Sequence, residues 1–209
     1  MIYAIYALYA ALIGYLLLAF LIGSIPFGYL IGRFAYRTDI RKSGSGNIGA
    51  MNALRTLGTK GALAVLLLDA GKGALAVLLP FVVWHPHGVP ALGGAMAVLG
   101  HCFSPWLRWK GGKGVATAFG AAFALSWPAG LVMVAVWILF GLVITRYSSV
   151  GSMAACIASP FALYGFTHAP LETAFGLFTA VLIPWTHREN IARLRKGTEG
   201  PIRLFQRKT

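Results

Sequence analysis

Acidic residues are scarce in this chain of 209 residues. Only 5 are Asp or Glu, against 18 Lys and Arg, and charged residues make up 11% of the sequence, which is less than half of the roughly 25% usual in soluble domains. So few charges argue strongly against a soluble globular domain. Disorder is excluded as well, because 58% of the residues are hydrophobic and the mean hydropathy is +0.73. The composition indicates a polytopic membrane protein with a basic face.

Cysteine is equally scarce. The two thiols, Cys102 and Cys156, cannot build a disulfide framework. Apart from His101 beside Cys102, neither has an evident activating charge nearby, so a thiol nucleophile is not expected. The start of the chain, Met-Ile-Tyr-Ala, lacks the basic residues of a secretory signal, and no cleaved signal peptide is expected.

Long uncharged stretches predict an all-α bundle of about seven membrane-spanning helices, forming one integral membrane domain over residues 1–209. A spanning helix needs about 20 apolar residues, so the uncharged stretches 73–107 and 114–145 are each too long for one span. Turn signals at Trp84–Pro90 and Ser126–Pro128 divide them. Five or six spans remain the alternative if the short fourth segment does not cross. The predicted spans are 4–31, 61–83, 90–107, 114–127, 129–145, 150–167 and 172–187.

Basic residues set the predicted orientation. With seven spans, all but one of the 18 Lys and Arg residues fall on one side, which the positive-inside rule assigns to the cytoplasm, leaving the N-terminus outside and the C-terminus inside. The exception is Lys72, which lies three residues after Asp69 and can pair with it on one helix face. Such a pair either has a function or only neutralises the helix. Gly23, Gly28 and Gly32 predict close helix contacts.

The first polar loop, residues 43–55, reads SGSGNIGAMNALR. Its glycines permit positive φ and close backbone approach, so successive N–H groups can converge on an anion, and Arg55 adds a fork-shaped cation suited to phosphate. Gly44, Gly46 and Gly49 formally match a dinucleotide fingerprint, but no strand or βαβ unit surrounds them. Phosphate binding is the favoured interpretation, with a plain surface turn as its alternative.

Three further segments add to this polar face. Residues 110–117, KGGKGVAT, place backbone donors and two lysines before a helix, but they lack the Ser/Thr of a Walker A loop. His187 and Asn190 lie three residues apart, so both face the same way on a helix. His187 can hold a phosphate or take a proton; taken alone, a histidine at a membrane boundary is favoured as a plain interface residue. Ser148 and Ser149 follow as hydroxyls at the predicted membrane boundary, where they can also cap a helix.

These segments together resemble the PlsY family of bacterial acyl-phosphate-dependent glycerol-3-phosphate 1-acyltransferases. Ser45-Gly46-Asn47, Asn52 and Arg55 resemble its first motif, and Gly100-His101 with Lys110-Gly111-Gly112-Lys113-Gly114 its second. His187-x-x-Asn190, with Gly197-x-Glu199 beyond it, resembles the third. The chain departs from the family at Met51, where Thr is usual, and at Pro105, which lies one place later than usual after His101.

The resemblance implies a reaction and its place in the cell. A long-chain acyl phosphate donates its acyl group to the 1-hydroxyl of sn-glycerol 3-phosphate, giving 1-acyl-sn-glycerol 3-phosphate (lysophosphatidic acid) and phosphate, in the first acylation of bacterial phospholipid synthesis. The enzyme would be a multi-pass protein of the bacterial cytoplasmic (inner) membrane, with its active site on the cytoplasmic face. A separate enzyme would supply the acyl phosphate. No metal, cofactor or nucleic acid is expected.

The resemblance also implies the site residues. Five residues would hold glycerol 3-phosphate and the reacting centre: His187, Asn190, Ser45, Arg55 and Lys113. Lys110 and the N–H groups of Gly111 and Gly112 would clamp the acyl phosphate, whose own phosphate is the favoured proton acceptor, with His187 as the alternative. The remaining expected substrate-binding residues are Gly44, Gly46, Asn47, Asn52, His101, Gly114, Thr117, Ser148 and Ser149. A membrane transporter of a phosphorylated solute and an anionic-lipid binder are the alternative functions.

Overall fold

The computed structural model describes residues 2–83 and 89–202, and every regular element in those two ranges is helical. Most of the turn predicted at Trp84–Pro90 lies outside the described residues. Short helical turns η1 (Ile40–Lys42) and η2 (Pro105–Leu107) lie in loops, and the π-helix η3 (Leu139–Ile144) continues α6. The α-helices are α1 (Ile2–Ser24), α2 (Phe27–Ala35), α3 (Ala50–Val83), α4 (Val89–Cys102), α5 (Val115–Leu125), α6 (Trp127–Ile138), α7 (Ser148–Thr167), α8 (Pro170–Thr186) and α9 (Arg188–Arg195).

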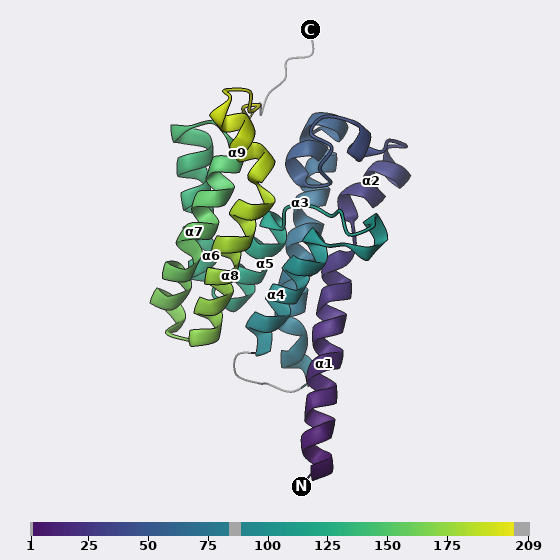
Figure 1. The fold of residues 1–209 in the computed structure, drawn as a ribbon, viewed down its shortest axis with the longest axis vertical. Coiled ribbons are helices and arrows are strands. Elements are labelled where there is room, and N and C mark those ends of the chain that lie inside the picture. The colour runs from purple at the N-terminus through teal and green to yellow at the C-terminus, as the bar shows by residue number, and fades with distance from the viewer. Residues whose placement is uncertain (1, 84–88, 203–209) are drawn as a thin grey trace.

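The helices form one bundle, which confirms the all-α prediction. In Figure 1, α3, α4 and α5 run through the middle, α1 lies along one side, and α6, α7 and α8 lie along the other. Helix α7 packs on α8 and α6, while α3 packs on α5 and α1 packs on α4. The short helices α2 and α9 both lie at the upper end in Figure 1, opposite the N-terminal end of α1.

Four described helical stretches are long and apolar enough to cross a membrane: Ile2–Ser24, Ala50–Phe81, Trp127–Ile144 and Ser148–Thr167. The other predicted spans contain shorter helices, with 14 residues in α4, 11 in α5 and 17 in α8. The fourth predicted segment is therefore short, as expected. The break at Ser126–Pro128 is also confirmed, because α5 ends at Leu125 and α6 begins at Trp127. The number of crossings and the direction of the termini stay predictions.

The predicted end of the first span is wrong, whereas the second predicted span agrees with the part of α3 that follows its kink. The first was expected to run over 4–31, but α1 ends at Ser24 and α2 starts at Phe27. Pro26 lies between them, and a proline lacks the N–H that a continuous helix needs and disfavours helical geometry in the residue before it. The second was expected over 61–83. Helix α3 begins earlier, at Ala50, but Gly58, with φ of 78° and ψ of −175°, separates its first turns from the part that runs on to Val83. The end of the first polar loop is therefore helical.

Small residues allow the central helices to approach closely. A Cβ added at Gly23 would lie 2.1 Å from the carbonyl oxygen of Ala97, so α1 and α4 touch through backbone atoms. A Cβ at Gly120 would lie 1.9 Å from the carbonyl oxygen of Ala70, so α5 and α3 do the same. Van der Waals packing of this kind holds helices together in lipid, where the hydrophobic effect does not drive their association. Close contact at the predicted Gly23 is confirmed.

Candidate active site

A cavity of about 570 Å³ opens among α3, α5, α6–η3 and the polar segments. One part of its wall is polar and comes from the first loop, the start of α3, the segment before α5, the start of α7 and the region around α9. The other part is apolar and comes from α3, α5, α6 and η3. The apolar wall contains Leu66, Ala70, Val115, Ala116, Phe119, Val134, Trp137, Ile138 and Leu142.

All five residues expected at the reacting centre line this cavity, although they come from distant parts of the sequence: Ser45, Arg55, Lys113, His187 and Asn190. Six of the other expected residues line it too: Asn47, Asn52, His101, Gly114, Ser148 and Ser149. Six are absent from its wall: Gly44, Gly46, Lys110, Gly111, Gly112 and Thr117.

Asn52 organises the first loop. Its buried side-chain NH₂ donates to the backbone carbonyls of Ile40, Ser43 and Asn47, at 2.8, 3.1 and 2.8 Å. Its Oδ1 accepts a 2.8 Å hydrogen bond from the Ser45 N–H. Both the oxygen and the NH₂ of the Asn52 side-chain amide are therefore hydrogen-bonded to backbone groups of this region. Gly44 and Gly46 have φ of +61° and +71°, and a Cβ at Gly44 would lie 2.2 Å from Asn52 Oδ1. These residues shape the loop.

Ser45 and Arg55 are available to a ligand. Both side chains are exposed, and within the described part of the chain neither hydroxyl nor guanidinium makes a hydrogen bond or ion pair. Arg55 lies in the first turns of α3, which fix the position of its backbone, and its side chain lines the cavity. A guanidinium left free in this way can bind a phosphate with two parallel hydrogen bonds.

Lys113, Asn190 and Glu199 form a chain of hydrogen bonds along the polar wall. The Lys113 ammonium donates to Asn190 Oδ1, and Asn190 Nδ2 donates to Glu199 Oε1 at 2.6 Å. Ser149 Oγ donates to the same carboxylate oxygen at 2.8 Å, and Arg193 Nε donates to Oε2 at 2.7 Å. Glu199 thereby ties the ends of α7 and α9 to the segment that carries Lys113.

Burial and charge perturb the pKa values of this chain. Desolvation, followed by the positive charge of Arg193, lowers the pKa of Lys113 to about 8. For Glu199, desolvation acts to raise the pKa, but the hydrogen bonds from Asn190, Ser149 and Arg193 outweigh it and hold that pKa below its ordinary value. At neutral pH the wall therefore carries an ammonium and a carboxylate separated by an amide.

His187 follows the last residue of α8 and is nearly buried, with 3% of its surface exposed. Its Nδ1 lies 2.8 Å from the carbonyl oxygen of Ile183. A carbonyl only accepts hydrogen bonds, so Nδ1 carries the hydrogen, and Nε2 of the neutral ring is an acceptor. Thr186, one residue earlier, donates to the carbonyl of Lys113 at 3.0 Å, which holds the end of α8 beside Lys113.

The second loop differs from its prediction. Gly111 and Gly112 were expected to clamp phosphate with their N–H groups, but these donate to the carbonyls of Cys102 and His101, at 3.0 and 2.9 Å. The loop folds back and caps the C-terminal end of α4, which satisfies carbonyls that the helix leaves free. Lys110 is exposed outside the cavity wall, and Thr117 is fully buried in α5. The prediction of N–H clamping by Gly111 and Gly112 is therefore wrong.

Several lining residues were not predicted as site residues: Asp69, Trp137, Ser152, Arg193 and Glu199. Arg193 lies three residues after Asn190 on α9, so helical spacing could have identified it. Glu199 was part of the third motif, but only the fold shows that it bonds to Asn190. Trp137 was hidden in an apolar helix, where its Nε1 donates to Ser152 Oγ at 3.3 Å.

Comparisons with known proteins agree on one family. A family model described as glycerol-3-phosphate acyltransferase matches residues 13–197. A glycerol-3-phosphate acyltransferase of Maricaulis maris (strain MCS10) is 45% identical over 172 residues, which cover 81% of this chain and 77% of that protein. Glycerol-3-phosphate acyltransferase 2 of Thermotoga maritima is 43% identical over 170 residues, covering 81% of this chain and 85% of that protein.

Two crystal structures have the same fold. Both are of PlsY, an integral membrane glycerol 3-phosphate acyltransferase. Its glycerol 3-phosphate form has a TM-score of 0.86 and 35% identity, covering 94% of this chain and 100% of that chain. Its lysophosphatidic acid form has a TM-score of 0.83 and 34% identity, covering 93% of this chain and 96% of that chain.

Proposed function

The chain belongs to the glycerol-3-phosphate acyltransferase family, and on this premise we propose that its acyl donor is a long-chain acyl phosphate and its acceptor the 1-hydroxyl of sn-glycerol 3-phosphate. It is an integral membrane enzyme that acylates glycerol 3-phosphate in phospholipid synthesis. The products are 1-acyl-sn-glycerol 3-phosphate and inorganic phosphate. Because the family is enzymatic, the transporter alternative is not supported.

The observation that carries the proposal is the two-part cavity. Its polar wall brings together Arg55, Lys113 and Arg193, and these three cations outnumber the two lining carboxylates, Asp69 and Glu199, which leaves the positive charge that phosphate groups require. Its apolar wall, from Leu66 to Leu142, offers an acyl chain the contacts that it would otherwise make with lipid. An acyl phosphate has both parts in one molecule. The glycerol 3-phosphate and lysophosphatidic acid forms of the similar PlsY support this assignment.

The reaction joins the acceptor oxygen to the acyl carbon and breaks the bond from that carbon to the phosphate oxygen. An acyl phosphate is a mixed anhydride with a good leaving group, so no covalent enzyme intermediate is needed. Arg55 and Ser45 bind the phosphate of glycerol 3-phosphate, and the Lys113 ammonium stabilises charge on the departing phosphate. Asn190 orients Lys113. The released phosphate takes the hydroxyl proton.

His187 positions the acceptor in this mechanism. Its Nε2 is free to accept a hydrogen bond, since Nδ1 donates to Ile183. A hydrogen bond from the acceptor hydroxyl to Nε2 would aim the oxygen at the acyl carbon. Glu199 is not a suitable base, because three hydrogen bonds already occupy its carboxylate. The remaining expected residues serve as support, with Asn52 holding the first loop and Ser149 holding Glu199.

Donor choice is the sharpest test. Purified protein in detergent would receive glycerol 3-phosphate with either palmitoyl phosphate or palmitoyl-CoA, and both phosphate release and lipid product would be followed. We expect lipid product when the donor is palmitoyl phosphate and none when it is palmitoyl-CoA. Omitting glycerol 3-phosphate controls for hydrolysis of the donor. Equal rates with palmitoyl-CoA would overturn the donor assignment.

We further propose that the protein lies in the bacterial cytoplasmic (inner) membrane with its cavity open to the cytoplasm, where a separate enzyme supplies acyl phosphate. The positive-inside distribution supports this, because all but one of the 18 basic residues fall on one side of the predicted topology. Single cysteines at Ser45 and Thr198 should resist an impermeant thiol reagent in intact cells, whereas one at Gly88 should react. Labelling of Ser45 and Gly88 from the same side would contradict the topology.

A further inference from the structure

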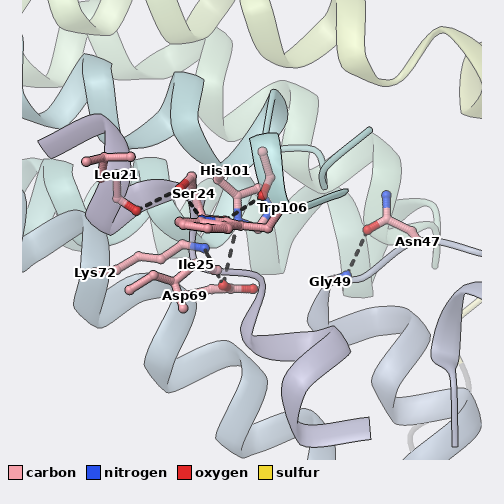
Figure 2. A network of polar contacts seen from close by, with 10 residues as sticks. Leu21, Ser24, Ile25, Asn47, Gly49, Asp69, Lys72, His101 and Trp106 are labelled. Carbon is pink, nitrogen blue, oxygen red and sulfur yellow. Dashed lines mark hydrogen bonds and ion pairs between the residues drawn. The ribbon is translucent and has the colours of Figure 1, made fainter. Parts of the chain in front are cut away.

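A buried charge cluster lies beneath the polar wall of the cavity. Asp69 and Lys72 come from the middle of α3, and His101 comes from the end of α4; their side chains are 1%, 2% and 4% exposed. Lys72 Nζ lies 2.8 Å from Asp69 Oδ1, and His101 Nδ1 lies 3.6 Å from the same oxygen (Figure 2). Asp69 and His101 line the cavity. The predicted pairing of Asp69 with Lys72 is confirmed, but the proposed mechanism leaves it without a role.

Lys72 anchors the pair to the break between α1 and α2. Its ammonium donates to the backbone carbonyl of Ile25 at 2.8 Å, as Figure 2 shows. The same region is closed by Trp106, whose Nε1 donates to Ser24 Oγ at 2.8 Å. The Asp69 carboxylate is therefore held at a fixed place, on the side of the imidazole that carries Nδ1.

The other side of His101 contacts the second loop. A Cβ added at Gly112 would lie 2.1 Å from His101 Nε2, so the imidazole packs directly on this glycine. The Gly112 N–H also donates to the His101 carbonyl at 2.9 Å. Gly112 is bonded to Lys113, the ammonium that hydrogen-bonds to Asn190. A continuous series of contacts thus runs from Asp69 through His101 and Gly112 to Lys113.

Stability alone does not account for this cluster. Taking two charges out of water is costly, and well-packed apolar residues of similar size often serve folding equally well or better. His101 Nδ1 lies 3.6 Å from Asp69 Oδ1, beyond hydrogen-bond distance, and the carboxylate acts on the ring by electrostatic attraction for its Nδ1 edge, which favours one orientation of the imidazole. An ordered ring packed on Gly112 limits where the backbone before Lys113 can lie.

We propose that Asp69 and Lys72 are positioning residues of the acyl transfer, which hold the His101 ring and thereby place the Lys113 ammonium for the substrate phosphate. The proposal rests on the proposed function, in which Lys113 contacts phosphate. Neither Asp69 nor Lys72 needs to touch the substrate. A small displacement of a charged group at a reacting centre can lower the rate by about 100-fold.

A double-mutant cycle tests the coupling to Lys113. Asp69→Asn keeps the shape of the side chain, and we expect it to lower kcat/KM for glycerol 3-phosphate by about 100-fold. In a Lys113→Met background the same change should lower it by less than about threefold, because the group being positioned is gone. If Lys113→Met turns over too slowly, the rise in Tm caused by saturating inorganic phosphate, the leaving group that Lys113 contacts in the proposed mechanism, replaces kcat/KM. Equal effects of Asp69→Asn in both backgrounds would overturn the proposal.

A second comparison separates positioning from folding. Asp69→Asn combined with Lys72→Met removes both charges, so it should recover Tm lost by either single variant while kcat/KM stays low. Recovery of both quantities would show that the pair is only structural. Ser159→Ala is the matched control. It removes a fully buried hydroxyl that lies 3.0 Å from Thr179 Oγ1, away from the cavity. Its effect on kcat/KM should be the same in the wild-type and Lys113→Met backgrounds. A wild-type protein without activity on acyl phosphate would instead refute the proposed function.

Discussion

The lowered pKa of Lys113 predicts a basic limit to activity. Desolvation and the charge of Arg193 bring this pKa to about 8, so the ammonium is about 90% protonated at pH 7 and about 10% at pH 9. A lysine whose pKa is depressed loses its charge as the pH rises through that value. A hydrogen bond from a charged donor contributes about 1.5–3 kcal/mol. Full deprotonation of Lys113 should remove this stabilisation of the transition state and lower kcat/KM by roughly 10–150-fold.

The assay is a pH profile of kcat/KM for glycerol 3-phosphate between pH 6.5 and 10, because this ratio reports groups of the free enzyme. Phosphate monoesters have their second pKa near 6, so the charge of glycerol 3-phosphate is constant over the basic limb. We expect kcat/KM to fall about tenfold per pH unit above pH 8, until it reaches the level of Lys113→Met.

Two variants show whether the limb belongs to Lys113. Lys113→Arg keeps a charge that does not titrate in this range, so its profile should be lower at pH 7 but flat up to pH 10. Lys110→Met is the matched control, because Lys110 is exposed in the same loop and lies outside the cavity wall; it should keep the wild-type limb. A limb that survives in Lys113→Arg, or a flat wild-type profile, would refute the reasoning.

Three other substitutions have expected outcomes. Arg55→Lys should raise the KM for glycerol 3-phosphate about tenfold or more with little change in kcat, since a point charge cannot replace a bidentate fork; an unchanged KM in initial-rate kinetics would contradict this. His187→Gln should also act mainly on that KM, because Gln keeps a hydrogen-bonding side chain, whereas a fall in kcat of about 10²–10⁴ would make His187 the general base. Glu199→Gln should lower both Tm and kcat/KM, because it weakens the charged bonds to Asn190 and Arg193, each worth about 1.5–3 kcal/mol; a variant with wild-type Tm and kinetics would show that those bonds are dispensable.

Much of the fold could be predicted from the distribution of charge and proline. Uncharged stretches identified the helices, and Pro128 marked the start of α6. The break near Pro26 was missed because residues 1–32 contain no charged side chain to divide them. Its stability depends on distant partners: Ser104 Oγ donates to the Ser24 carbonyl, and Lys72 donates to the Ile25 carbonyl. Contacts over such sequence distances cannot be read from a local pattern.

The residues of the cavity wall were predictable where a side chain reaches the wall directly from its own motif, as at Arg55 and His187. They were not predictable where hydrogen bonds to the protein's own backbone decide which polar groups remain available to a ligand. The KGGKG segment reads as a row of N–H donors, yet the chain folds back and two of those donors cap α4. Asn52 similarly reads as a ligand, but its amide holds the first loop together. Only tertiary structure decides whether a polar group faces the ligand or the protein.

The placement of Asn190 explains how the site stays positive with a carboxylate so near. Within the described residues the Lys113 ammonium makes no ion pair, since Asn190 stands between it and Glu199. A direct Lys113–Glu199 pair would neutralise the charge that a phosphate must find. The amide can accept from the ammonium with Oδ1 and donate to the carboxylate with Nδ2 at once. Glu199 therefore orients the polar wall through a neutral intermediary, while the charge of Lys113 remains available to the substrate.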